Sequence, residues 1–259
     1  MLLKNANNKE SPLLRYLTIA TQLNMNIIVT GASSGIGFET VKVLSLNSGN
    51  NIIAIARNEK NLKKLCEECL LLNPQAKVYP IAFDLENNDF NNLHSLILVY
   101  FSQINILINN AGLLINKPFE QLNQEEVYRM FNVNFFSVFK LVQLLIPHFN
   151  ISTTAHIINV SSMGGFQGSS KFPGLSAYSA SKASLINLTE CLAVELRDKN
   201  IYVNCLALGA VQTEMLAKAF PGYKAPLTPD IIAPFIADFS LNGYRYFNGK
   251  TLPVSLSVP

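Results

Sequence analysis

The stretch that decides the fold is Asn26-Ile27-Ile28-Val29-Thr30-Gly31-Ala32-Ser33-Ser34-Gly35-Ile36-Gly37. Its first five residues have the apolar, β-branched composition of a buried strand, and the amphipathic pattern that follows predicts a helix to about Leu46. The glycines between them are spaced GxxxGxG, and they predict a tight turn whose backbone can approach a phosphate group. A strand, a glycine-rich turn and a helix in this order favour a doubly wound α/β domain.

The remaining sequence alternates short apolar runs with helical patterns, which predicts a parallel sheet covered by helices. We expect one Rossmann-type domain with a seven-stranded, mostly parallel sheet and helices on both faces. The further strands are predicted at 52–56, 78–82, 104–108, 156–160, 201–206 and 251–254. The further helices are predicted at 60–72, 90–101, 124–149 with a break near Pro147, 178–197 and 230–239. The segment 210–228, which contains two prolines and a glycine, is expected to be an irregular lid.

Residues 1–24 are polar, rich in asparagine and without a clear period. We therefore interpret 1–24 as an N-terminal extension and 25–259 as the single folded domain. Met25 directly precedes the first strand, so an alternative start at Met25 fits the pattern. Truncation to Met25 is expected to leave folding and activity intact, and loss of soluble protein would contradict this.

Composition limits the classes of function. The chain has 259 residues, 49% of them hydrophobic and 14% charged, with a formal net charge of +3. That length suits one large α/β domain. The small net charge and the lack of a basic run argue against nucleic acid as a partner. Because no run approaches about 18 apolar residues and no secretory signal is evident, we expect no membrane partner and a cytoplasmic protein.

Cysteine and histidine residues do not indicate a metal site. Cys66 and Cys69 have CxxC spacing, but no second cysteine pair or nearby histidine accompanies them, and they lie in an amphipathic helical pattern. Incidental thiols on a helix are the simpler interpretation. We predict no metal and a reducing environment.

The ends of the predicted strands indicate a dinucleotide site. After the second strand, Arg57 stands where a carboxylate would bind the ribose of NAD, and an arginine there suits the 2′-phosphate of NADP. We therefore expect NADP(H) to be preferred, with NAD(H) possible. Asp84 follows the third strand and can accept a hydrogen bond from the adenine amino group. Asn110-Ala111-Gly112 follows the fourth strand and brings backbone close to the adenosine.

Tyr178 and Lys182 are four residues apart, so on a helix they share one face. An ammonium beside a phenol favours phenolate and lowers the tyrosine pKa toward neutrality, which suits proton exchange with a substrate. Taken alone, the pair is more typical of an ordinary helix surface, because many helices contain such spacings.

Together these motifs closely resemble the classical short-chain dehydrogenase/reductase family from Asn26 to the C-terminus. The resemblance rests on residues 30–37, 109–112, Asn134, Ser162, Tyr178 with Lys182, and 203–209. It implies that Tyr178 is the general acid/base and that Lys182 lowers its pKa and binds the nicotinamide ribose. It also implies that Ser162 polarises the substrate carbonyl and that Asn134 positions Lys182 through water.

The resemblance extends to the rest of the site. It implies cofactor contacts from Gly31, Ser33, Ser34, Gly35, Ile36, Gly37, Arg57, Asp84, Leu85, Asn110, Ala111, Gly112, Tyr178, Lys182, Gly209, Val211 and Thr213. The expected substrate walls are Gly164, Phe166, Phe172, Phe220 and Tyr223, although the aromatic residues would also suit core packing. Three departures from the family pattern stand out: Leu208-Gly209 in place of Pro-Gly, an apparent insertion at 168–173, and Asn105 where the family often has an acidic residue.

The expected activity is therefore interconversion of a small-molecule carbonyl and a secondary alcohol by hydride transfer. A reductase of carrier-bound 3-oxoacyl chains, an extended-family epimerase or dehydratase, and a non-catalytic dinucleotide-sensing protein on the same fold are the alternatives. In this family, helices corresponding to 124–149 and 178–197 form subunit interfaces, so a homodimer or homotetramer is expected.

Overall fold

The computed structural model describes residues 24–86, 89–150 and 152–256. Almost all of the predicted N-terminal extension, residues 1–23, lies outside this part of the chain. The expectation that the chain can be shortened to Met25 therefore stays a prediction.

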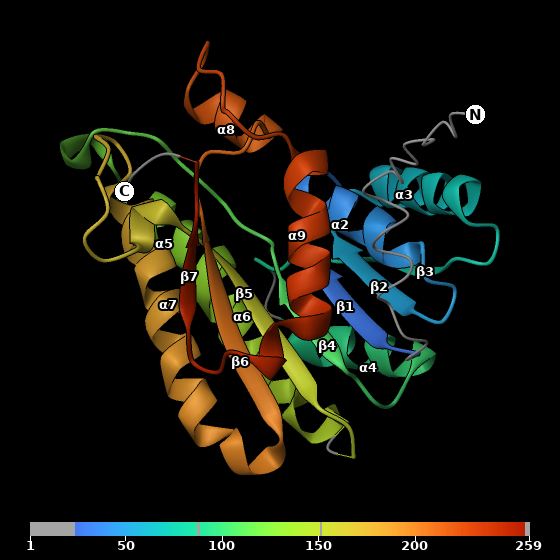
Figure 1. Cartoon of the computed structure of the whole chain (residues 1–259). Coiled ribbons are helices and arrows are strands. Elements are labelled where there is room, and N and C mark those ends of the chain that lie inside the picture. The colour runs from blue at the N-terminus through green and yellow to red at the C-terminus, as the bar shows by residue number, and fades with distance from the viewer. Residues whose placement is uncertain (1–23, 87–88, 151, 257–259) are drawn as a thin grey trace, which may run out of the picture.

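A single sheet organises the described residues (Figure 1). Its seven strands have the order β3-β2-β1-β4-β5-β6-β7, and every pair is parallel. The strands are β1 (Asn26–Thr30), β2 (Asn51–Ala56), β3 (Lys77–Ala82), β4 (Ile106–Asn109), β5 (Ala155–Ser162), β6 (Ile201–Leu208) and β7 (Thr251–Val254). This confirms the doubly wound Rossmann-type fold and shows that the sheet is parallel throughout. The strand order reverses between β1 and β4, which is where such folds bind ligands.

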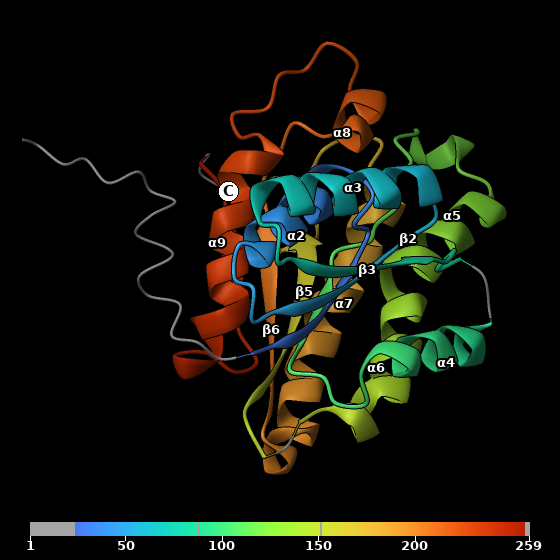
Figure 2. The same cartoon turned by 90° about the vertical axis from the view of Figure 1, so that its right-hand side faces the viewer.

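Helices cover both faces of the sheet (Figures 1 and 2). One face carries α2 (Gly35–Ser45), α3 (Glu59–Leu72) and α9 (Pro229–Asn242) over a buried core that includes Ile27 and Val29. The other carries α4 (Phe90–Tyr100), α6 (Ser137–Leu145) and α7 (Ser176–Glu195) over a second core that includes Ile28. Successive residues of β1 thus serve opposite layers, as the alternation of side chains along a strand requires.

Helix ends follow local sequence signals. Asn58 and Asp89 accept hydrogen bonds from the first turns of α3 and α4, and Asn123 forms a capping box with Glu126 at the start of α5 (Gln124–Phe131). Helix α3 ends one residue before Asn73-Pro74, because the residue before a proline is disfavoured in a helix.

Two segments differ from the sequence-based expectation. The long helix predicted at 124–149 contains a π-helical turn, Asn132–Phe136, and ends in a 3₁₀ turn, Ile146–His148. The segment expected to be irregular contains the short helix α8 (Glu214–Ala219), whose first turn is capped by the hydroxyl of Thr213. Figures 1 and 2 show α8 standing beyond the sheet, apart from the layered helices.

By length and composition, one helical run of the described residues, Gln124–His148, would be able to cross a membrane, with a mean hydropathy of 1.4. Its α6 portion packs on the sheet through Val138, Leu141 and Leu145. A helix that packs against one face of a parallel sheet is rich in apolar residues because that side of the helix is buried.

Candidate active site

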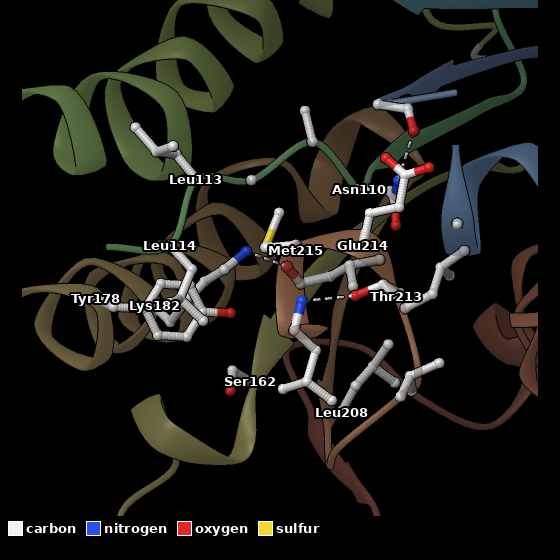
Figure 3. Close-up of a pocket in the computed structure, with 18 of the residues that line it drawn as sticks. Asn110, Leu113, Leu114, Ser162, Tyr178, Lys182, Leu208, Thr213, Glu214 and Met215 are labelled. Carbon is white, nitrogen blue, oxygen red and sulfur yellow. Dashed lines mark hydrogen bonds between the residues drawn. The ribbon is translucent and has the colours of Figure 1, made fainter. Parts of the chain in front are cut away.

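A cavity of about 710 Å³ opens at the carboxyl ends of the strands. It extends from Arg57 and Asp84, after β2 and β3, to Tyr178 and Lys182 on α7. Figure 3 shows Tyr178, Lys182 and Ser162 gathered on one side of it, with Asn110 and Thr213 on the other. One continuous space therefore joins the predicted dinucleotide residues to the predicted proton-transfer residues.

The glycine turn forms part of the cavity wall and leaves no room for side chains. Gly31 has a φ of +69°, and a Cβ on it would lie 2.8 Å from Cα of Ala111. A Cβ on Gly37 would lie 2.5 Å from the backbone oxygen of Gly31. Gly37 lies outside the cavity lining and packs beneath the turn. The turn thus presents backbone to the cavity, at the N-terminus of α2.

The turn is fixed to the end of β4 through Thr30 and Asn110. The Thr30 hydroxyl accepts hydrogen bonds from the backbone N–H groups of Asn110 and Ala111, both at 3.1 Å. The Asn110 amide donates to the backbone oxygen of Thr30 at 3.0 Å. These bonds hold the two sides of the switch point together.

At the far end of the cavity, Arg57 is exposed directly after Ala56, the last residue of β2. Among the described residues, no carboxylate forms an ion pair with it. Asp84 and Leu85 line the same end. The guanidinium is therefore available to an anionic ligand.

Ser162 ends β5 and Tyr178 lies in the first turn of α7, and both side chains line the cavity. The Ser162 hydroxyl accepts a hydrogen bond from the N–H of Gly164 at 3.1 Å. This bond fixes the serine oxygen at the end of β5, on the same side of the cavity as the phenol (Figure 3). A substrate oxygen placed between them would meet two hydroxyl groups.

Lys182 lies one turn after Tyr178 and is only 4% exposed. Its ammonium donates to the backbone oxygen of Val160 on β5 at 2.8 Å. Burial lowers the pKa of Lys182 to about 8, and the neighbouring Cys205 acts weakly in the other direction.

The structure does not show the expected lowering of the Tyr178 pKa. Burial raises the pKa of Tyr178, and only the Ser162 hydroxyl opposes this shift. The physical reason is that the Lys182 ammonium is directed at the backbone oxygen of Val160, while burial penalises the phenolate form of Tyr178. The electrostatic effect of Lys182 predicted from spacing alone is therefore outweighed by desolvation.

Asn134 is fully buried in the middle of the π-helical turn. Its side chain accepts from the N–H of Leu113 at 2.7 Å and donates to the oxygen of Leu113 and the hydroxyl of Ser181, both at 2.9 Å. It therefore holds the loop after β4 against the residue next to Lys182. A Cβ on Gly112 would lie 3.5 Å from both the Asn134 side-chain oxygen and the Lys182 ammonium. Asn134 is outside the cavity lining and supports it from behind.

The cavity brings together most of the residues predicted from sequence. The predicted residues in its lining are Gly31, Ser33, Ser34, Gly35, Ile36, Arg57, Asp84, Leu85, Asn110, Ala111, Gly112, Ser162, Gly164, Phe172, Tyr178, Lys182, Gly209, Val211, Thr213, Phe220 and Tyr223.

Phe166, expected among the substrate walls, lies outside the cavity lining. It follows the 3₁₀ turn Met163–Gly165, and its backbone oxygen accepts hydrogen bonds from Ser169 and Lys171. The sequence interpretation also missed lining residues, chiefly Leu113, Leu114, Met163, Leu175, Met215 and Leu216. Leu113 and Leu114 directly follow Gly112, after the end of β4. This position could have identified them as lining residues from the sequence. Among the described residues, no group of three or more potential ligands is placed to hold a metal ion.

Comparisons with known proteins agree with this site. A family model described as short chain dehydrogenase matches residues 25–224. A 3-oxoacyl-[acyl-carrier-protein] reductase of Thermotoga maritima is 33% identical over 192 residues, which cover 74% of this chain and 76% of that protein. An L-xylulose reductase of Caenorhabditis elegans is 37% identical over 190 residues, 73% of this chain and 72% of that protein.

Among solved structures, a 3-ketoacyl-(acyl-carrier-protein) reductase of Brucella melitensis complexed with NADH superimposes with a TM-score of 0.79 at 26% identity. The match covers 91% of this chain and 98% of that chain. The family model alone spans well over half of the sequence, and it includes both the glycine turn and the Tyr178–Lys182 pair. This chain belongs to the short-chain dehydrogenase/reductase family.

Proposed function

We propose that the protein is an NADP(H)-dependent oxidoreductase that interconverts a carbonyl compound and a secondary alcohol, with Tyr178 as proton donor and acceptor. The observation that carries this proposal is the single cavity that joins the glycine turn and Arg57 to Ser162 and Tyr178. A screen of NADPH consumption over ketones, aldehydes, sugars and acyl thioesters tests it.

The residues present fit a dinucleotide. The turn at Gly31 and Gly35 offers backbone to a pyrophosphate, and the cavity is long enough to reach from Arg57 to Lys182. The adenosine would be held by Arg57, Asp84 and Leu85, and the nicotinamide end by Lys182, Gly209 and Thr213. When bound, a nicotinamide dinucleotide supplies hydride exchange with a carbon atom of the substrate.

The protein's own residues bind the substrate oxygen and exchange a proton with it. In the reduction direction, the hydroxyl of Ser162 donates to that oxygen and orients the carbonyl, while Tyr178 Oη gives up its proton as negative charge develops. In the oxidation direction Tyr178 Oη takes the proton back. The Lys182 ammonium stabilises the phenolate formed during reduction, so its buried charge acts where the reaction creates an anion.

Preference for NADP(H) rests on Arg57. Its guanidinium follows Ala56 without an adjacent acid, and a fork of N–H donors suits a phosphate better than a ribose diol. The relative complexed with NADH argues for measuring both cofactors. A specificity constant that favours NADH over NADPH would contradict the preference.

A reductase of carrier-bound 3-oxoacyl chains is the second candidate, and it is favoured by the names of the relatives from Thermotoga maritima and Brucella melitensis. The L-xylulose reductase is more similar to this chain, at 37% identity, than either of these reductases. Similarity alone therefore does not identify the substrate. Turnover of carrier-bound and free 3-oxoacyl compounds, compared with simple ketones, separates the two. A non-catalytic sensor is disfavoured because Tyr178, Lys182, Ser162 and Asn134 are all present.

We further propose that the protein acts in the cytoplasm as a homodimer or homotetramer. Apolar side chains are exposed along the helices expected to form the interface, including Tyr128, Phe136, Phe139 and Val194. Sedimentation velocity of the purified protein tests the assembly, and a monomer at micromolar concentration would contradict it.

A further inference from the structure

A second cavity of about 610 Å³ lies beside the first and shares Phe172 and Leu175 with it. It runs between the 3₁₀ turn Phe119–Gln121, which follows β4 in the chain, and the apparent insertion that precedes α7. We call this space the tail groove. Its lining consists of Pro118, Phe119, Glu120, Lys171, Phe172, Pro173, Gly174, Leu175, Ser176 and Ser179.

Two large aromatic side chains of the tail groove are exposed to solvent. Phe119 is 78% exposed and Phe172 is 59% exposed, and they enter the lining from segments about fifty residues apart in the sequence. Covering such apolar surface is favourable, and two aromatic walls of one groove favour a ligand that passes between them. Neither side chain belongs to the two cores that stabilise the fold.

The insertion is held in a defined shape. The ammonium of Lys171 donates to the oxygen of Phe166 at 2.6 Å and to the hydroxyl of Ser169 at 2.8 Å, and Ser169 is buried. At its other end, the oxygen of Gly174 accepts from the N–H of Lys117 at 3.0 Å. Phe172 therefore stands on a loop fixed at both ends, so a ligand meets a groove that is already formed.

The charges around the tail groove favour an uncharged occupant. The only cation in its lining, Lys171, is directed into its own loop. The only carboxylate, Glu120, would repel an anionic ligand. The remaining wall is mainly aliphatic and aromatic.

We propose that the tail groove binds the uncharged apolar tail of a carbonyl substrate whose carbonyl group lies between Ser162 and Tyr178. This deepens the proposed function and rests on it. Because Phe172 and Leu175 line both spaces, a chain that passes over them leaves the first cavity and enters the groove. Ser179 of the groove also directly abuts Gly164 of the first cavity.

The test uses unreactive mimics, so that it does not depend on turnover. Binding of N-alkylacetamides from N-butyl to N-dodecyl is measured by calorimetry on the full-length protein, with and without NADP⁺. Each methylene that becomes fully buried strengthens binding by about fourfold, and partial burial by about twofold. In the wild type we expect affinity to rise through the long members of the series.

Phe119→Ser and Phe172→Ser are expected to end this rise at a shorter chain. In Phe119→Ser, whose side chain lines only the tail groove, the shortest amide is expected to bind within about twofold of its wild-type value. Tyr246→Ser is the matched control, because Tyr246 is 79% exposed and lines neither space. It is expected to leave the series unchanged.

Absence of amide binding at every length, or equal chain-length dependence in wild type and both variants, would overturn the proposal. A third outcome would also overturn it: a sedimentation coefficient that differs between the variants and the wild type, together with unchanged affinities for the amides. Phe119 and Phe172 would then contact a second copy of the chain. Failure of the proposed function would appear separately, as absence of NADPH oxidation with every carbonyl compound despite chain-length-dependent amide binding.

Discussion

The ammonium of Lys182 on α7 donates a hydrogen bond of 2.8 Å to the backbone oxygen of Val160 on β5, two residues before Ser162. The bond ties the helix that carries Tyr178 to the strand that carries Ser162. It also holds a buried cation at the cavity, where burial lowers the lysine pKa from 10.5 to about 8. A shift of this size means that the folded state disfavours the charged lysine by about 3 kcal/mol at neutral pH.

Lys182→Met is therefore expected to abolish turnover while raising the free energy of unfolding at pH 7 by about 1–3 kcal/mol. The folded protein binds fewer protons than the unfolded chain between pH 8 and 10.5, so wild-type stability rises with pH in this window. In urea unfolding, the difference in free energy of unfolding between Lys182→Met and the wild type should be smaller at pH 9.5 than at pH 7. Lys199→Met, at an exposed lysine, is the control, and a destabilised Lys182→Met protein would contradict the cost assigned to burial.

Tyr178→Phe removes the proton donor and keeps the ring. We expect kcat to fall by about 10²–10⁴-fold, the range associated with loss of a general acid or base. The dissociation constant for NADPH, measured by fluorescence titration, should stay within about threefold, because the residues of the glycine turn and Arg57 are untouched. Turnover near the wild-type level would refute the role of Tyr178.

Arg57→Ala should change cofactor preference without harming the fold, since the side chain is exposed at the end of β2. A hydrogen bond to a charged group contributes about 1.5–3 kcal/mol, so kcat/KM for NADPH should fall by about 10- to 100-fold. The value for NADH should change by less than about threefold. An equal loss with both cofactors would indicate that Arg57 contacts a part that they share.

We expect the protein to lose stability in mild acid because of the buried side chain of His156. It is buried, its Nδ1 lies 3.0 Å from the oxygen of Ser240, and its Nε2 lies 3.0 Å from the side-chain nitrogen of Asn204. Asn204 accepts from the N–H of Lys250, which leaves its amide to donate to Nε2, so the ring is neutral with its proton on Nδ1. Burial accordingly lowers the pKa of His156 from 6.5 to about 4.

Because the unfolded chain takes up this proton between pH 6.5 and 4 and the folded state does not, the contribution of His156 is complete above pH 6.5. It is lost as pH falls toward 4, by about 3 kcal/mol in total. Urea unfolding of the wild type from pH 7.5 to 4.5 measures the slope. His156→Gln should have a smaller slope, and an unchanged slope would assign the acid sensitivity to other groups.

The fold was predictable because its signals are local. The apolar run at 26–30 and the glycine turn specify β1 and the start of α2, and repeated alternation specifies the parallel sheet. The π-helical turn around Asn134 was not predictable, since residues 132–136 contain neither proline nor glycine. Helix α8 was missed because Pro221 and Gly222 dominate that segment, although Thr213 is a typical N-cap residue.

The site was predictable where a motif places a residue directly at the end of a strand, as for Ser162 and Arg57. It was not predictable where a side chain's direction depends on a turn, as for Phe166. The tail groove forms where two loops that are far apart in the sequence come together in the fold. The pKa of Tyr178 depends on desolvation. Neither property is encoded in residue spacing.

Asn116 connects the lid to the loop after β4. Its side-chain nitrogen donates to the backbone oxygen of Ala219, the last residue of α8, at 2.7 Å. Asn116→Ala should free the lid and raise KM for the carbonyl substrate by about two- to tenfold, the equivalent of one ordinary hydrogen bond, with a smaller change in kcat. Trypsin cleavage after Lys218 or Lys224 should accelerate by a similar factor, because cleavage follows the population of the open lid. Asn187→Ala, at an exposed position of α7, is the control, and unchanged KM and cleavage in Asn116→Ala would show that the lid is held by other contacts.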